Sequence, residues 1–272
     1  MTVDTRLAAA FEAACRAELR APKPGNVHDF APGHRMTVRD FEVSAAAAAP
    51  FIAARGQPIG ARVLGAMRAT MDSVGCNTNL GILLLAAPLA AARERPGDLR
   101  QNLGAILAES TVEDAGAVFE AIRIANPGGL GRADTHDVAA EPTVTLTQAM
   151  AEAAHRDRIA RQYITSFGDL FTVGAPVWQS FDRSADPLRR TLAVYFTFAS
   201  TWPDTHVSRK HGPEVAEHVR RLFAEKLEIA AQYDLPALLD FDRELKLLGV
   251  NPGTSADLTV AVEFLVRVLE DK

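Results

Sequence analysis

The sequence predicts an all-α fold, a single-domain multi-helix bundle with functional loops between the helices. Almost every long segment repeats its apolar residues at three- and four-residue intervals, the period of an amphipathic helix. Period-2 runs rich in β-branched residues are nearly absent, and residues 142–147 are the one short candidate for a strand. The chain has 272 residues, 48% of them hydrophobic, so it can bury one sizeable core. We therefore expect one domain over residues 1–272.

Local signals place the helices in order along the chain. The first helix is Ala-rich, and Phe11 and Leu19 lie on its apolar face. Thr37 and Asp40 form an approximate capping box that opens the second helix, which should stop before Gly56. The expected helices span residues 4–20, 37–55, 58–74, 79–94, 98–108, 111–125, 145–170, 187–201, 213–233, 235–247 and 255–270.

The later helices carry comparable signals. Met67 and Met71 recur at helical spacing in the third helix. Thr111 opens the sixth with another box-like sequence. In the ninth, a stripe that includes Val219 and Phe223 lies opposite a face of charged residues. The strand candidate directly precedes the seventh helix, and we expect it to lead into that helix.

Composition excludes several classes of protein. The net charge is −5 and the pI is about 5.8, which is atypical of a general nucleic-acid surface. The apolar run 82–93 is shorter than the ~20 residues of a membrane-spanning helix, and residues 1–6 lack the pattern of a secretory signal. Cys15 and Cys76 lack metal-ligand spacing, so we expect reduced thiols. We expect a cytoplasmic protein without nucleic-acid or membrane partners; its Ala-rich helices allow close packing within or between subunits, so a homo-oligomer is open.

The stretch Gly75-Cys76-Asn77-Thr78-Asn79-Leu80-Gly81, between two apolar helices, has two interpretations. A buried amide costs roughly 1–3 kcal/mol when it is unpaired, so these side chains are either paired or used. Asn and Thr cap helix starts, which makes the stretch a helix–turn–helix corner. The other interpretation is a pocket floor whose amides face a ligand. Composition alone favours the corner.

Two other interruptions gather charged residues beside Pro and Gly. The turn Lys23-Pro24-Gly25-Asn26-Val27-His28 presents an ammonium and an imidazole, which suits a phosphate; a solvated loop is equally compatible. The unpatterned stretch 126–144 contains Asp134, His136 and Asp137 after a run of glycines. Its two carboxylates suit Mg²⁺, which prefers oxygen ligands, and Asx-turn capping is the alternative.

Charged residues also occur at two later helix starts. Asp157 and Arg161 form an i,i+4 pair, which favours an ordinary salt-bridged helix face. Ser255 or Thr254 is expected to cap the last helix, whose free N–H groups suit an anion. Asp257 in the first turn has a simpler role in favouring the helix dipole.

A further break, residues 204–212, gathers an acid, two histidines and two cations after an apolar helix. Asp204, His206, Arg209 and Lys210 are its candidate functional residues. Motifs of serine hydrolases, zincins and thiol redox enzymes are absent from the sequence, so these three classes have no support.

Together these breaks resemble one family. The chain is similar to the triphosphoribosyl-dephospho-CoA synthases, which make the prosthetic-group precursor of citrate lyase and malonate decarboxylase. The similar elements are Lys23-Pro24-Gly25-Asn26-Val27; Gly75, Asn77, Thr78 and Gly81; Asp204, Thr205, Val207, Arg209 and Gly212; and Pro252-Gly253-Thr254-Ser255-Ala256-Asp257-Leu258. They follow in order over nearly the whole chain, and this shifts the interpretation of residues 75–81 towards a pocket wall.

The sequence differs from the citrate lyase type of this family at two positions. Asn79-Leu80 stand where the citrate lyase type has His-Lys. The middle of the chain is similar to a sub-group from methanogenic archaea and methylotrophic bacteria, organisms that use methanopterin- and methanofuran-type one-carbon carriers. Two alternatives therefore keep the nucleotide site: an enzyme of one-carbon-carrier biosynthesis, or a non-catalytic nucleotide-binding relative.

The resemblance implies a transferase reaction in which a ribose hydroxyl of dephospho-CoA attacks C1′ of ATP and adenine leaves. Such chemistry needs cations and Mg²⁺ for the phosphates, a carboxylate for developing positive charge, and groups that move protons. From motif position and residue type, the catalytic candidates are Asp204, His28 and His206; the ATP-binding candidates are Lys23, Asn26, Asn77, Thr78, Asn79, Arg209, Lys210 and Ser255; and the Mg²⁺ candidates are Asp137, Asp134 and Asp257.

Overall fold

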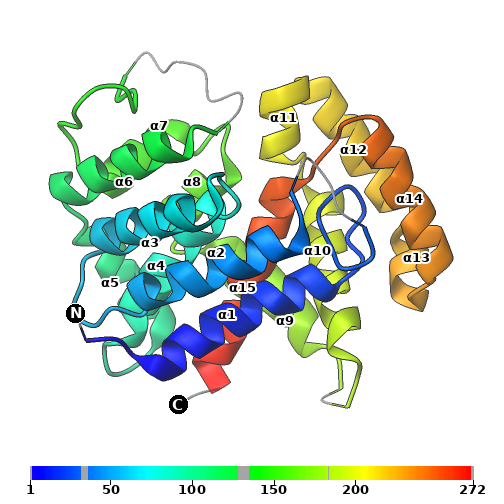
Figure 1. Ribbon diagram of the computed structural model, residues 1–272, viewed down its shortest axis with the longest axis horizontal. Helices are drawn as coiled ribbons and strands as arrows, with labels where there is room; N and C mark the ends of the chain where they lie inside the picture. Colours follow the sequence, from blue (N-terminus) through cyan, green and yellow to red (C-terminus); the bar gives the residue numbers. More distant parts are fainter. Residues whose placement is uncertain (1, 32–35, 128–134, 183, 271–272) are drawn as a thin grey trace.

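Helices make up the regular structure of this computed structural model, which describes residues 2–31, 36–127, 135–182 and 184–270 (Figure 1). The all-α prediction is confirmed. The first helices are α1 (Thr5–Arg20), α2 (Val38–Ile52), α3 (Ile59–Val74), α4 (Leu80–Arg93), α5 (Leu99–Ala108), α6 (Val112–Ala125), α7 (Leu146–Ala153) and α8 (Arg158–Ile164). A π-helical turn, η1 (Leu170–Gly174), is followed by α9 (Ala175–Gln179), α10 (Pro187–Thr201), α11 (Thr205–His211), α12 (Pro213–Glu225), α13 (Leu227–Gln232), α14 (Leu235–Leu247) and α15 (Gly253–Glu270).

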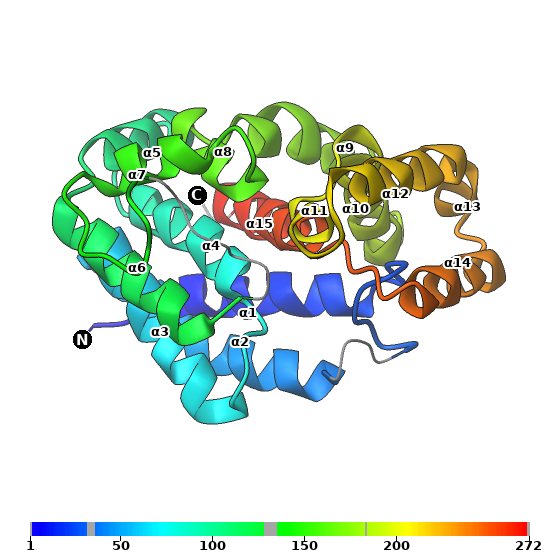
Figure 2. The same cartoon turned by 90° about the horizontal axis from the view of Figure 1, so that it is seen from above.

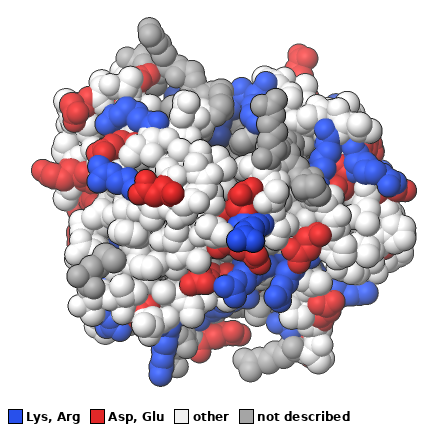
Figure 3. Space-filling model, viewed as in Figure 1, with Lys and Arg blue, Asp and Glu red and all other residues white. Residues whose placement is uncertain are grey.

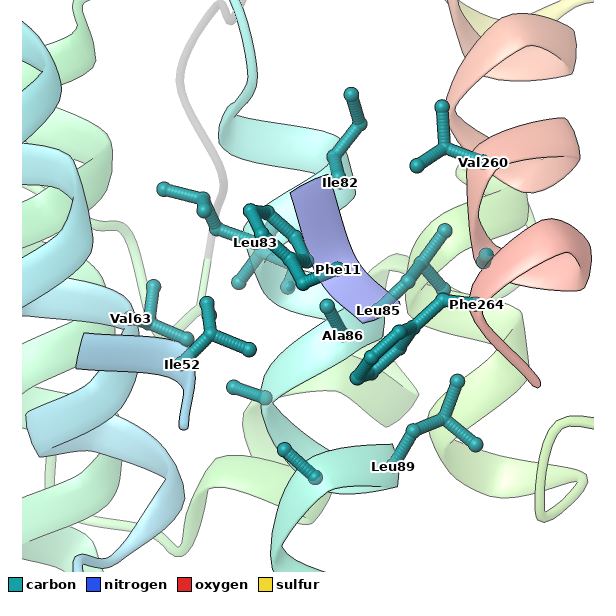
Figure 4. Packing of buried hydrophobic residues seen from close by; sticks show 14 of the residues in the cluster. Phe11, Ile52, Val63, Ile82, Leu83, Leu85, Ala86, Leu89, Val260 and Phe264 are labelled. Carbon is teal, nitrogen blue, oxygen red and sulfur yellow. The ribbon is translucent and has the colours of Figure 1, made fainter. Parts of the chain in front are cut away.

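The main core is built around α4, which is apolar on all its faces and almost wholly buried. Leu83 on this helix has no exposed surface. Ile52 and Val63 pack on one side of α4, and Val260 and Phe264 pack on the other (Figure 4). The apolar run of the sequence is thus a central core helix, and none of the described helices is long and apolar enough to cross a membrane.

A second apolar cluster lies among α10, α12 and α14, on the side of the molecule away from α3 and α6 (Figure 2). The rings of Phe196, Phe223 and Phe241 meet edge to face there, with centroids 5.1 and 5.0 Å apart. Val194 and Phe198 of α10 belong to the main core. Helix α10 therefore joins the two clusters through different faces.

Two predicted helix starts are confirmed in atomic detail. Thr37 and Thr111 each accept a hydrogen bond from the backbone N–H three residues on, and the carboxylates of Asp40 and Asp114 accept from the backbone N–H of the threonine. Thr145 caps α7 in the same way. The former strand candidate thus leads into a helix, as its position predicts.

The prediction of one helix over residues 145–170 is wrong. The chain leaves the helix after α7, and Asp157 starts α8 by accepting hydrogen bonds from the first N–H groups of that helix. Ser166 and Phe167 then have positive φ values of 47° and 57°, which turn the chain before η1. The apolar residues of the sequence kept a helical spacing across these breaks, because α7 and α8 each bury one face.

Other boundaries differ for similar reasons. The segments left between the expected helices, residues 171–186 and 202–212, contain the short helices α9 and α11. The helix expected over 213–233 is divided at Lys226, whose φ of −106° separates α12 from α13. Short helices such as these depend on tertiary contacts rather than on their own propensity.

Gly25 is required by its backbone conformation and by its neighbours. Its φ is +82°, and a Cβ atom there would lie 2.9 Å from Pro252 Cδ and 3.2 Å from Leu245 Cβ. We expect Gly25→Ala to lower the free energy of unfolding by about 2–4 kcal/mol, because strain and overpacking add. Gly56→Ala is the matched control, since its φ is +67° but nothing lies within 4 Å of the added atom. Urea unfolding should show a loss of about 1 kcal/mol for the control; equal losses would contradict the packing argument.

Candidate active site

A cavity of about 760 Å³ lies where several helix ends meet. It is bordered by the beginnings of α4, α8, α11 and α15, by the ends of α1, α3 and α6, and by α7. In Figure 1, α7 and α11 lie on opposite sides of this region. The N-terminal N–H groups of the two long helices, α4 and α15, favour negative charge in the cavity.

The cavity has an apolar side and a charged side. Helices α3, α4, α6 and α7 contribute most of the apolar side chains, while charged side chains come from α11, from the start of α15 and from the turn before α8. The apolar residues include Met71, Phe119, Ile122, Ile124 and Met150, and the polar residues include Asp157, His206, Arg209, Lys210 and Asp257. This combination suits a ligand that joins a flat or apolar part to an anionic part.

The whole stretch 75–81 lines the cavity. Within it, Asn77 Oδ1 accepts hydrogen bonds from the N–H groups of Asn79 at 3.3 Å and Leu80 at 3.0 Å, which forms the turn that leads into α4. The corner and the pocket wall are therefore the same structure.

The next two side chains of this wall are also held by the protein. Thr78 Oγ1 donates to Ser44 Oγ at 2.6 Å, and Asn79 Nδ2 donates to Thr70 Oγ1 at 3.0 Å. Both are buried, and both border the cavity. Their internal partners fix the shape of the wall on the side facing α2 and α3.

The Lys-Pro-Gly loop is packed inward rather than solvated. Lys23 has no exposed surface; its Nζ lies 3.1 Å from Glu18 Oε1 and donates to the Val27 carbonyl at 2.8 Å. Its side chain is not part of the cavity wall, whereas Asn26 is, and Asn26 Nδ2 donates to Asn251 Oδ1 at 2.8 Å. This last bond ties the loop to the segment that enters α15.

His28 also lies behind the cavity rather than on it. It is fully buried, and its Nε2 is 3.3 Å from Asp242 Oδ1 on α14. Asp242 Oδ1 accepts from the N–H of Gly25, and its Oδ2 lies 2.9 Å from Lys246 Nζ. The catalytic candidate His28 is thus placed in a buried network that fastens the loop to α14.

Because His28 is buried, we expect the free energy of unfolding to depend on pH. Burial lowers the pKa of His28, an effect that Asp242 opposes and that the charges of Lys23 and Lys246 reinforce. Below the usual pKa of about 6.5 the unfolded chain takes up a proton that the folded chain resists, so the free energy of unfolding should fall from pH 7 to pH 5. The lowered pKa of Asp242 acts in the same direction, but near and below pH 4.

Urea midpoints at pH 7 and pH 5 measure this effect. His28→Gln should reduce the difference between the two midpoints, because it removes the titrating ring. His218→Gln changes an exposed histidine on α12 and should keep the wild-type difference. A His28→Gln difference as large as that of the wild type would contradict the assignment.

Asp204 connects the starts of two helices. Its Oδ1 accepts from the N–H groups of His206 at 2.9 Å and Val207 at 3.1 Å, which caps α11. Its Oδ2 accepts from the N–H and the hydroxyl of Ser255, both at 2.8 Å. Burial raises the pKa of Asp204, and these hydrogen bonds oppose that rise.

This geometry corrects the expected start of the last helix. Helix α15 begins at Gly253, so Thr254 and Ser255 lie in its first turn and do not cap it. The anion predicted at this helix start is a protein side chain, because the N–H of Ser255 donates to the carboxylate of Asp204. Neither Asp204 nor Ser255 borders the cavity, and both are buried.

The cations of α11 border the cavity. Arg209 Nη1 lies 3.1 Å from Asp157 Oδ2, so Asp157 pairs with α11 instead of the expected Arg161. Arg209 Nε is buried and has no hydrogen-bond partner among the described residues. Lys210 is exposed beside it, and His206 is partly buried on the same wall. These side chains form the most cationic part of the cavity.

Asp257 enters the cavity from the first part of α15. A Cβ atom on Gly81 would lie 2.1 Å from Asp257 Oδ2, so the glycine makes room for the carboxylate. Burial raises the pKa of Asp257 well above its usual range, and the negative charges of Glu18 and Asp204 add to the rise. The carboxylate has no ion-pair partner within the described part of the chain.

The remaining metal candidates divide between described and undescribed positions. Asp137 borders the cavity, and its Oδ1 accepts from the N–H of Ala139 at 2.8 Å, the Asx turn that was the alternative. Asp134 and the glycines before it lie outside the described residues. Over residues 2–31, 36–127, 135–182 and 184–270, no three His, Cys, Asp or Glu side chains gather as a metal-binding group.

Several cavity residues were not among the sequence candidates. Glu18 is the most buried of the charged ones, with 4% of its surface exposed. It occupies the inner part of an amphipathic helix, where nothing in the local pattern marks it. The others with polar side chains include Cys76, Glu152, Arg156, Asp157, Asn251 and Thr254.

Comparison with known proteins gives a family match and a similar structure. The model of the family CitG, described as ATP:dephospho-CoA triphosphoribosyl transferase, matches residues 4–272. A crystal structure from Archaeoglobus fulgidus, of a protein proposed to be a triphosphoribosyl-dephospho-CoA synthase, is similar with a TM-score of 0.65 and 27% identity. The match covers 82% of this chain and 95% of the other. None of the curated proteins compared matches the chain.

Proposed function

The chain belongs to the ATP:dephospho-CoA triphosphoribosyl transferase family, and we propose that it transfers the triphosphoribosyl group of ATP to dephospho-CoA in the cavity described above. The predicted family, transferase activity and use of ATP are confirmed by the family match. One observation supports this site more than any other: a single cavity brings together residues 75–81, α11, the start of α15 and Asn26, so all four segments that resemble the family contribute to it.

Three cations on the charged side are placed to hold phosphates. Arg209 and Lys210 come from α11, and Arg156 reaches the cavity from the turn before α8. Arginine presents several N–H donors to phosphate oxygens, and each charge-assisted bond is stronger than a neutral one. We assign these side chains to the triphosphate of ATP and the diphosphate of dephospho-CoA.

The apolar side suits the uncharged parts of the substrates. Phe119, Ile122 and Met150 offer flat or flexible apolar surface from α6 and α7. Purine rings and an aliphatic arm both gain by leaving water for such a surface. We assign the adenine of ATP to this side, which places C1′ between the apolar and charged sides.

Mg²⁺ fits the donor set of the cavity. It commonly takes one or two protein carboxylates together with phosphate oxygens, and it supplies charge neutralisation for the phosphates. Asp137 and Asp257 are the candidates that border the cavity. We assign them to the metal, and we assign the charge on Asp157 to the support of Arg209.

Adenine needs a proton as it leaves. His206 is the one sequence-predicted acid–base histidine that borders the cavity, since His28 is buried behind it. Its ring lies beside Gly253, where an added Cβ would be 3.3 Å from Nδ1. We assign the proton donation to His206, on the wall that also carries the phosphate-binding cations.

A direct assay separates this function from its alternatives. The purified protein is incubated with ATP and Mg²⁺, with and without dephospho-CoA, and released adenine is measured by chromatography. Adenine release that requires dephospho-CoA supports the proposal. Release that requires a one-carbon-carrier precursor instead would support the second enzyme, and ATP binding without release in either mixture would support a non-catalytic relative.

Several predictions from the sequence stay predictions: one domain, a cytoplasmic location, a role in one-carbon metabolism, a possible homo-oligomer, the use of Mg²⁺ and the roles of the site residues. The expectation of small-molecule partners agrees with the substrates of the family. On the face shown in Figure 3, acidic and basic side chains are interspersed, as the scattered charges of the sequence suggest.

A further inference from the structure

Glu18 is a buried carboxylate that reaches the cavity wall from the last turn of α1. Its neighbours in the sequence, Cys15 and Leu19, belong to the apolar interior. A carboxylate in such surroundings is costly unless it is paired. The structure pairs it with Lys23, at 3.1 Å between Oε1 and Nζ.

Lys23 holds this carboxylate from behind. Its side chain has no exposed surface and is not part of the cavity wall, while Glu18 is. The second bond of Nζ, to the Val27 carbonyl at 2.8 Å, fixes the ammonium in position. The pair therefore presents one charged group to the cavity, the carboxylate, and keeps its counter-ion on the protein side.

Other titratable groups face Glu18 from the surrounding helices. The negative charge of Glu18 raises the pKa values of Asp257 on α15, of Tyr195 on α10 and of Cys15 on its own helix. Burial raises the pKa values of all three, so near neutral pH the thiol and the phenol are uncharged. Glu18 is thus the cavity carboxylate with a dedicated buried cation.

We propose that Glu18 is the general base that takes the proton of the attacking ribose hydroxyl, and that Lys23 is a positioning residue that acts through it. This inference rests on the proposed function. The hydroxyl oxygen of dephospho-CoA forms a bond to C1′ while the bond from C1′ to the adenine nitrogen breaks with its electron pair. The hydroxyl proton goes to Glu18, and adenine receives a proton from His206.

The two residues act as one functional unit with different signatures. Removing the carboxylate removes the base, whereas removing the ammonium leaves a base that holds its proton more strongly. Without a neighbouring cation the pKa of a buried carboxylate rises, because burial alone disfavours its charged form. The acidic limb of the pH–rate profile reports the ionisation of this base.

The test is the pH dependence of kcat/KM for dephospho-CoA-dependent adenine release. Glu18→Gln should lower kcat/KM about 10²- to 10⁴-fold at pH 8 and abolish the acidic limb. Lys23→Met should retain activity at high pH but move the acidic limb upwards by about one pH unit or more. Glu12→Gln alters a surface ion pair on the same helix and should keep the wild-type profile.

The double variant Glu18→Gln/Lys23→Met separates folding from chemistry, because it leaves no buried charge without a partner. It should unfold at a urea concentration above that of Glu18→Gln and remain as inactive. Activity of Glu18→Gln within tenfold of the wild type, or an unmoved acidic limb in Lys23→Met, would overturn the inference. Absence of dephospho-CoA-dependent adenine release from the wild type would instead contradict the proposed function, whatever the variants do.

Discussion

Replacing Asp204 with alanine is expected to lower the free energy of unfolding by about 3–5 kcal/mol and to remove activity. The single carboxylate accepts four hydrogen bonds, two from the start of α11 and two from Ser255 in α15. Alanine would leave three of these donors without this partner at a buried site, while the His206 N–H would keep its bond to Thr254 Oγ1. The same change would release α11, which carries Arg209, from α15, which carries Asp257.

Asp186→Ala is the matched control for this prediction. Asp186 is also an aspartate at the start of a helix, but it is exposed and accepts one hydrogen bond, from Leu188. Its loss should cost about 1 kcal/mol. Urea unfolding of both variants measures the loss in free energy of unfolding. Equal losses would contradict the role of Asp204 in holding α11 to α15, which we call the Asp204 clamp.

Asp204→Asn tests the catalytic role that motif position suggests. Asparagine keeps one acceptor oxygen but turns an N–H donor towards the other pair of donors, so we expect lower stability and slower adenine release. If adenine release persists at the wild-type rate, the catalytic role of Asp204 is wrong. If the free energy of unfolding is also unchanged, the proposed role of the Asp204 clamp in stability is wrong as well.

The second large effect is expected at Arg209. We expect Arg209→Gln to weaken ATP binding about 10- to 100-fold, because a charge-assisted bond to phosphate contributes about 1.5–3 kcal/mol. One nitrogen of the guanidinium already pairs with Asp157, and its buried Nε has no protein partner among the described residues. A phosphate oxygen would satisfy that donor.

The measurement is calorimetric titration of each variant with ATP and Mg²⁺. Arg243→Gln is the control, since Arg243 is exposed on α14, pairs with Asp240 and does not border the cavity. The control should bind ATP as the wild type does. Unchanged affinity in Arg209→Gln would remove this arginine from the phosphate site.

Local patterns predicted the helix starts that depend on nearby residues. Thr37 and Thr111 find their capping partners three residues away, so the sequence is enough to locate them. Asp157 and Asp204 also cap their own helices locally, but each has a further partner on another helix. Asp157 pairs with Arg209, and Asp204 meets Ser255 across a separation of 51 residues. Such pairs follow from packing, which explains why the helix expected over 145–170 was divided and why the cap of the last helix was misplaced.

The candidate site shows the same division. Motif residues such as Asn77, Arg209 and Asp257 do border the cavity. Lys23 and His28 lie behind it. The sequence does not predict this, because a charged residue in a loop gives no local sign of whether it is exposed or buried. Glu18 was missed for the complementary reason: its position on the buried face of a helix becomes visible only when the cavity is formed.

Cys76 offers the most direct test of the claim that the substrates occupy this cavity. It lines the cavity and is partly exposed, whereas Cys15 is buried elsewhere and serves as the internal control. Burial raises the pKa of both thiols, so alkylation should be followed at alkaline pH.

The rate of Cys76 alkylation is measured by mass spectrometry with and without saturating ATP, Mg²⁺ and dephospho-CoA. We expect the substrates to slow modification of Cys76 about tenfold or more, because they fill the space in front of the thiol. Modification of Cys76 at an unchanged rate, under conditions in which adenine is being released, would place the reaction elsewhere and contradict the account.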